Sequence, residues 1–281
     1  MKLSNYLNGS PELTLLVDKK GVSYNDFLKK LQPNYFLVYC KMIIPMLFLI
    51  IFSFFLWHEN VQGIAGVLFL ILGPFYISFW KAAYMLHMHE GAHWNIHKSK
   101  ILNDWIANLL LTPFTGIWIK EYRKSHWLHH RFLGTHLDTE ISYLTPINAV
   151  KFLESLTGIY LLIGVFRYFK NFLIISKDNK KMGIAKFISS LLLMLIFQIG
   201  IVAFFILNDS ILLGLIWLAS IFITDPFFGK LRQTLEHRSY QFGDDADFSA
   251  VEHGPINRNF GNDFFQDILV RLALISICCT I

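Results

Sequence analysis

Two short segments of this 281-residue chain carry histidines at the spacing of metal ligands. His89 and His93 are four residues apart, and His126, His129 and His130 form an H-x-x-H-H run. Residues three or four apart share one face of a helix. Imidazole is a good ligand for iron, copper, zinc and nickel. Five or six nitrogens exceed the needs of one tetrahedral zinc ion, so their number favours a centre of two metal ions.

The elements that must position these histidines are membrane spans. Hydrophobic residues make up 54% of the chain and charged residues only 16%, too few to coat a soluble domain. A spanning helix needs about 20 apolar residues. Four stretches qualify: Tyr35–Trp57, Val61–Trp80 with a continuation to Leu86, Ala185–Leu207, and Ser210–Gly229.

The distribution of basic residues predicts how these spans are oriented. The short connections His58–Asn60 and Asn208–Asp209 contain no Lys or Arg, so the spans form two hairpins whose tips are free of positive charge. The positive-inside rule then places both termini and the region between the hairpins in the cytoplasm. His237 follows the fourth span, so all candidate ligands lie on this cytoplasmic side. The net charge of +5 suits anionic lipid, and it does not require nucleic acid as a partner.

The remaining segments are too polar or too short to span. Residues 1–33 form a cytoplasmic N-terminal segment without a signal peptide. Apolar pieces of the central region, Ile101–Ile119 and Phe152–Phe169, are expected to lie on the membrane surface or cap the site. A fifth apolar segment, Phe264–Ile281, is expected at the interface. The predicted fold is an all-α integral membrane protein with four spans and a cytoplasmic helical cap that carries a dimetal site.

At these residues the sequence resembles the membrane fatty acid desaturase family. The H-E-G-A-H run that ends at His93 is similar to the first histidine box of that family, and the H-W-L-H-H run that ends at His130 is similar to the second. The run Arg232–His237 resembles the segment that supplies a further ligand after the fourth span. Gln233 matches an amide that meets iron through water in some members. The resemblance covers roughly residues 30–275.

One part of the family pattern does not appear. The resemblance implies a third box, usually H-x-x-H-H, some 40 residues or more beyond the fourth span, and His253 is the last histidine. The expectation is that the desaturase-like domain, residues 34–281, is cut short before that box. One or two iron ligands would then be missing.

The resemblance implies an oxygen-dependent desaturase of long-chain acyl groups, active in lipid metabolism. The cofactors would be two Fe²⁺ ions with dioxygen as co-substrate, because no side chain removes hydrogen from an unactivated C–H bond. The partners would be an acyl substrate or lipid, the bilayer, and a separate ferredoxin- or cytochrome-like electron donor suited to a basic face. The expected iron ligands are His89, His93, His126, His129, His130 and His237. The candidates to hold the N–H groups of these ligands are Glu90, Glu121, Asp138, Glu140 and Glu236.

Other functions remain open at this point. Related diiron hydroxylases, carotenoid ketolases and alkane monooxygenases carry similar boxes. The run His89–His93 also matches H-E-x-x-H, in which two histidines bind zinc and the glutamate is the general base of a protease. That interpretation leaves the H-x-x-H-H run unexplained, and Gly91 weakens the helix that the motif needs. A folded but inactive remnant is the third possibility.

Overall fold

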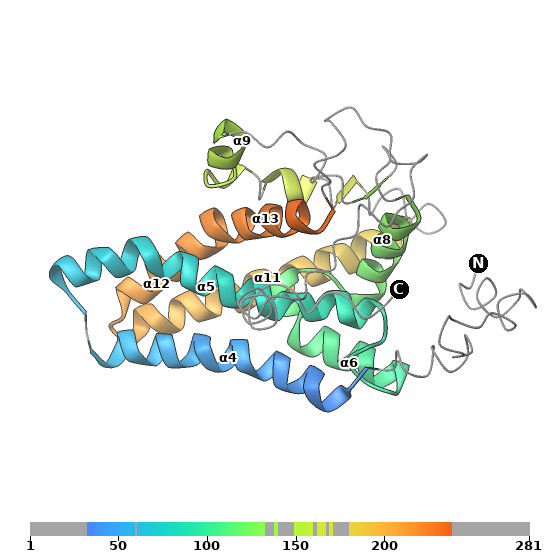
Figure 1. The fold of residues 1–281 in the computed structure, drawn as a ribbon, viewed down its shortest axis with the longest axis horizontal. Helices are drawn as coiled ribbons and strands as arrows, with labels where there is room; N and C mark the ends of the chain where they lie inside the picture. Colours follow the sequence, from blue (N-terminus) through green and yellow to red (C-terminus); the bar gives the residue numbers. More distant parts are fainter. Residues whose placement is uncertain are drawn as a thin grey trace, which may run out of the picture.

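The computed structural model of the protein describes residues 33–59, 61–132, 138–139, 149–159, 162–166, 169–170 and 180–237. Every regular element within these ranges is a helix (Figure 1). Most of the expected N-terminal segment and all of the apolar segment Phe264–Ile281 lie outside the described residues. The same holds for Glu140, which was expected beside the site.

Four helices are long and apolar enough to cross a membrane, as the sequence predicts. They are α4 (Tyr35–His58), α5 (Gly63–Ala92), α11 (Lys180–Leu207), and a composite fourth helix. This fourth helix consists of α12 (Ile211–Ala219), the π-helical turn η2 (Ser220–Thr224) and α13 (Asp225–His237). The helix α5 runs six residues beyond the predicted end, so His89 lies on the spanning helix itself.

The spans pack through a core of aliphatic side chains from α4, α5 and α12. Leu49, Ile77, Leu213 and Ile216 are all buried there. Gly73 of α5 allows the close approach of α12, because a Cβ at this position would lie 2.9 Å from Cγ2 of Ile216. Small residues at such contacts let membrane helices pack closely. Many large apolar side chains on the outer faces are exposed, which fits a lipid surrounding.

The two connections without basic residues meet at one end of the bundle. The indole N–H of Trp57, near the end of α4, donates to the carbonyl of Asn208, which follows α11, at 3.2 Å. Figure 1 shows both turns at the left end of the molecule. The opposite end carries the polar segments with the histidines.

Short helices cover this opposite end: α6 (Lys100–Leu110), α7 (Thr112–Thr115) and α8 (Ile119–Phe132). The short helix α9 (Ala149–Glu154) lies on the side of the fourth span instead (Figure 1), and a Cβ at Gly158 would lie 2.9 Å from the backbone oxygen of Phe222. The helix α6 begins where Ser99 Oγ accepts from the backbone N–H of Leu102. It buries Ala107 and exposes Trp105 and Leu109, each about 70% accessible. A helix that buries one face in protein and exposes a large apolar face is typical of the membrane interface.

Candidate metal centre

The first histidine pair lies where α5 ends. His89 is in the last turn of α5, and His93 is the residue that terminates the helix. The chain then turns sharply through Trp94, whose φ of 60° is uncommon for a bulky residue. Gly91 lies in the same turn, and a Cβ there would come within 3.1 Å of the side chains of Ile119 and Ile96. The glycine therefore lets α8 and the turn after α5 approach the pair closely.

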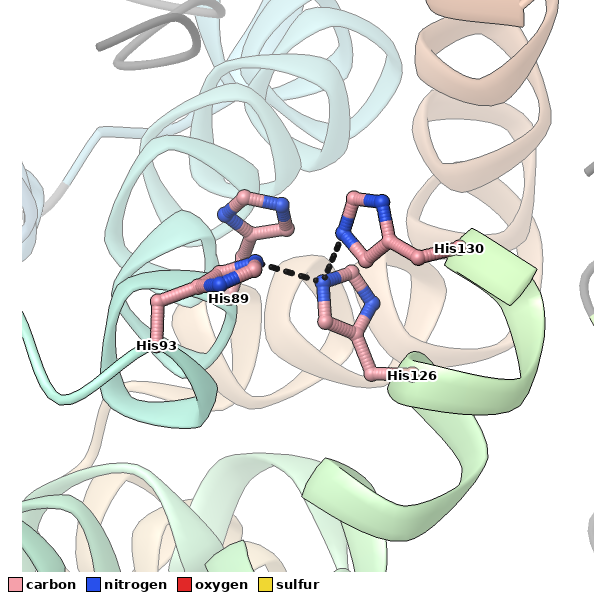
Figure 2. A group of neighbouring side chains, drawn as sticks. All are labelled: His89, His93, His126 and His130. Atoms are coloured by element: carbon pink, nitrogen blue, oxygen red, sulfur yellow. Dashed lines mark hydrogen bonds between the residues drawn. The ribbon is translucent and has the colours of Figure 1, made fainter. Parts of the chain in front are cut away.

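The second pair lies on α8, one turn apart. His126 is buried and His130 is exposed, and both point from α8 towards the end of α5 (Figure 2). The loop before α8 is held by Gly116, whose φ is 67° and at which a Cβ would lie 3.0 Å from the sulfur of Met194. The backbone N–H of Ile119 donates to Oδ1 of Asn108 at 2.9 Å, which anchors the first residue of α8 to α6.

Four imidazoles converge between these two helices. One nitrogen from each of His89, His93, His126 and His130 lies within 4.8 Å of the others. Nε2 of His126 is 3.0 Å from Nε2 of His93 and 2.9 Å from Nε2 of His130. Figure 2 shows the four rings facing a common point. These four residues are called the histidine cluster below.

The spacing of these nitrogens can be compared with that of metal ligands. Two nitrogens that bind one ion at about 2.1 Å and at right angles lie about 3.0 Å apart, whereas a tetrahedral angle separates them by about 3.4 Å. The two short contacts of His126 match the right angle. The same spacing permits N–H···N hydrogen bonds between neutral imidazoles, in which one nitrogen of each pair carries a proton that a metal ion would displace. The donor set therefore fits the ligands of one metal ion.

The electrostatic surroundings keep His93 neutral. Burial, with a smaller effect of the neighbouring His89, His126 and His130, lowers its pKa to about 2. Glu90 acts in the opposite direction. A neutral imidazole offers a lone pair at neutral pH, which is the form that binds metal.

A buried arginine joins the two helices that carry the cluster. Arg123 lies three residues before His126 on α8. Its Nε donates to the carbonyl of Ala92 and its Nη2 to the carbonyl of Gly91, each at 2.9 Å. These carbonyls belong to the last residues of α5, and that of Gly91 also accepts from the backbone N–H of Trp94 at 3.2 Å. The guanidinium is paired with Asp104 and lies over the ring of Trp94.

An asparagine from α6 completes this junction. Nδ2 of Asn103 donates to the carbonyl of Gly91 at 2.9 Å, and its Oδ1 accepts from the backbone N–H of Ile96 at 3.0 Å. Sequence reasoning did not select Asn103 or Arg123. For Arg123 the sequence contained a partial signal. An arginine that lies one helical turn before a ligand histidine, on a helix that is half-buried, is a candidate for burial.

His129, the fifth predicted ligand, lies beside the cluster and not within it. Its ring centroid is 5.8 Å from that of His126 and 5.6 Å from that of His130. Its Nδ1 is 2.7 Å from Oδ1 of Asp138, and both side chains are almost fully buried. A carboxylate that accepts from one nitrogen directs the other nitrogen of the ring, so the pair has the arrangement of a metal ligand and its orienting partner.

The other predicted residues have different positions. Oε1 of Glu90 is 3.4 Å from Nδ1 of His89, and its Oε2 accepts from Asn95 at 2.9 Å. Glu121 faces away from the cluster and pairs with Lys186 at 3.3 Å. Gln233, Glu236 and His237 lie on the last turns of α13, and their side chains are outside the described part of the structure.

Comparisons with known proteins agree with this arrangement. A sequence model of the family described as fatty acid desaturase matches residues 62–268. No curated protein and no solved structure gives a significant match. The matched region begins just before α5 and includes every predicted ligand. The chain belongs to the fatty acid desaturase family.

Proposed function

We propose that the protein is an oxygen-dependent fatty acyl desaturase that introduces a double bond into a long-chain acyl group at a histidine-ligated centre of two iron ions. The observation that carries the proposal is the histidine cluster, with four imidazole nitrogens within 4.8 Å of one another at the ends of α5 and α8. Membership of the desaturase family and four helices that can span a membrane support it.

Bound iron would supply the oxidation of an unactivated C–H bond with dioxygen and two external electrons. The protein's own residues would hold the iron ions and orient their ligands. His89, His93, His126 and His130 would hold one ion. His129 would hold the second through Nε2, because its Nδ1 is paired with Asp138. Position 237 on α13 would add a further imidazole to the centre, with position 233 one turn before it.

The expected substrate is long and apolar. An apolar cavity of about 640 Å³ lies between α4 and α11, inside the spanning part of the bundle. Phe114 and Trp217 form part of its wall. Phe114 also contacts Tyr84, five residues before His89, with ring centroids 5.4 Å apart. No residue of α5 or α8 lines the cavity, and it reaches Trp57 and Asn208 at the end away from the cluster. Phe114 connects it to α5, and its apolar lining suits a hydrocarbon ligand.

The electrons would come from a separate acidic carrier protein. Lys120, Lys124 and Arg131 are exposed on α8, the helix that carries His126 and His130. A basic surface on that helix is complementary to an acidic partner and would speed its association.

Metal analysis of the purified protein tests the centre. Protein expressed with added iron and extracted in mild detergent should retain iron, close to two ions per chain. His126→Ala should lower the retained iron to about one ion per chain or less, because Nε2 of His126 contacts two other ligand nitrogens. His58→Ala is the matched control, since its side chain is 69% exposed at the opposite end of the bundle. One zinc ion per chain together with peptide cleavage would refute the proposal and indicate a metalloprotease.

Product analysis tests the reaction. Membranes that contain the protein, supplied with iron, an electron donor and acyl lipids, should accumulate acyl chains that have lost two hydrogens, as measured by gas chromatography with mass detection. Hydroxylated or ketone products would assign the protein to the related oxygenases. Iron-loaded protein that forms neither product would indicate an inactive remnant.

A further inference from the structure

Two opposite charges form a pair between the spans, towards the end of the bundle that carries the histidines. Lys81 of α5 is 5% exposed, and its Nζ is 2.5 Å from Oδ2 of Asp225, the first residue of α13. A charged side chain in a spanning helix is costly unless it is paired. Helices that only cross a membrane do not need such a pair, and a charged residue at this depth usually has a specific role.

Hydroxyl groups extend the ion pair into a network between α5 and the fourth span. Oγ of Ser78 donates to Oδ1 of Asp225 at 2.5 Å and lies 2.6 Å from Oγ1 of Thr224. Thr224 also donates to the carbonyl of Pro74 at 2.9 Å. The four residues Ser78, Lys81, Thr224 and Asp225 are called the clasp below. The contacts of Ser78 and Lys81 with Thr224 and Asp225, and that of Thr224 with Pro74, join α5 to the fourth span.

The backbone of the fourth span changes immediately before Asp225. Residues Ser220–Thr224 form a π-helical turn, and α-helix resumes at Asp225. One extra residue in a turn rotates the rest of a helix by about 100° relative to an uninterrupted α-helix. The π turn and the clasp therefore decide together which side of α13 faces α5.

The clasp also sets the height of α13 along α5. Both helices run towards the histidine-bearing end of the bundle (Figure 1). From Ser78 to His89 and His93 the chain advances 11 and 15 residues, about 17 and 23 Å of helix. From Thr224, the hydroxyl partner of Ser78, to His237 it advances 13 residues, about 20 Å. The backbone of position 237 thus lies at a height between His89 and His93.

We infer that the clasp is a positioning device that sets the axial register and rotation of α13 on α5, so that position 237 reaches the metal centre between His89 and His93. Lys81 and Asp225 are positioning residues and touch neither metal nor substrate. The inference rests on the proposed function, because it takes the centre to bind iron through His237.

Replacement of the whole ion pair separates positioning from folding. Exchange of a buried pair for apolar residues of similar size is often neutral for stability, whereas removal of one partner leaves an unpaired charge. The double variant Lys81→Met with Asp225→Leu should therefore keep the wild-type melting temperature. It should release iron to a chelator about tenfold faster, the lower end of the effect of losing an orienting partner. Lys186→Met is the matched control, since that lysine forms an exposed pair with Glu121.

A second measurement reports the register without any metal. In a background with Cys40, Cys278 and Cys279 replaced by alanine, His89→Cys with His237→Cys should be joined by a short bismaleimide. Addition of Lys81→Met and Asp225→Leu to this protein should reduce the cross-linked fraction several-fold. Asp225→Asn, which keeps an acceptor for Ser78, should give an intermediate yield and serves if the double variant is not recovered from membranes.

The two readouts keep this inference apart from the proposed function. Wild-type protein that binds no iron would refute the iron centre, while loss of cross-linking without the clasp would still support the positioning role. Unchanged iron release and unchanged cross-linking in the double variant would overturn the positioning role and leave the iron centre intact.

Discussion

His126 has a different position from the other residues of the histidine cluster. Its Nε2 lies within 3.0 Å of Nε2 of both His93 and His130. Its ring also stacks on Tyr122, with centroids 5.3 Å apart and planes inclined by 14°. Because stacking fixes the plane of the imidazole, the direction of its lone pair is settled before any ligand arrives. Preorganisation of this kind lowers the cost of binding.

At the same scale, the pair of His129 and Asp138 leads to a prediction. Asp138→Asn keeps the shape of the side chain but removes the charge that orients His129. Iron affinity should fall by about 10- to 100-fold, the usual cost of losing such a partner. Chelator competition on the purified protein measures it. Asp209→Asn, in the exposed turn at the other end, is the control, and equal affinities of the two variants would contradict the orienting role.

At the scale of helices, the packing of α5 on α12 depends on one missing side chain. Gly73→Ala would bring a Cβ to 2.9 Å from Ile216, which is fully buried and cannot move aside. The expected loss is about 1–3 kcal/mol of unfolding free energy, the usual cost of overpacking.

Thermal unfolding in detergent measures this loss. Gly200→Ala is the matched control, because Gly200 lies in the middle of α11 and a Cβ there meets nothing within 4 Å. A melting temperature of Gly73→Ala equal to that of Gly200→Ala would show that α12 can shift away.

Hydropathy was sufficient to predict the four spans, because each is an apolar run of about 20 residues or more with very few charges. The spacing of His89, His93, His126 and His130 was sufficient to predict that they lie together. The contacts between side chains of different helices were not predictable in the same way. Lys81 and Asp225 are 144 residues apart, and nothing in the sequence sets the distance between them.

Two further features escaped prediction for physical reasons. A π-helical turn such as Ser220–Thr224 changes the rotation of a helix without changing its composition, so hydropathy does not reveal it. Arg123 bonds to backbone carbonyls, which every residue possesses, so no sequence pattern identifies its partners.

At the scale of the whole molecule, the charge pattern predicts which end of the bundle faces the cytoplasm. The turns that contain Glu59 and Asp209 lie at the end without basic residues, and Trp57 links that end across to Asn208. In the background without native cysteines, Glu59→Cys and Asp209→Cys should react with an impermeant maleimide added outside intact cells. Lys98→Cys and Lys124→Cys should react only after the cells are opened. The reverse labelling pattern would show that the bundle has the opposite orientation in the membrane.

The uninterrupted length of α5 has a consequence for the membrane in which the protein works. Its 30 residues extend about 45 Å, while the hydrocarbon layer is about 30 Å thick. One continuous helix therefore begins inside the bilayer and holds His89 and His93 at a fixed distance beyond it. A thinner or thicker bilayer is accommodated by tilt or by local deformation of the lipid. The thickness of the lipid therefore affects the position of the histidine site, because tilt of α5 moves the imidazoles of His89 and His93 together with the rest of the helix.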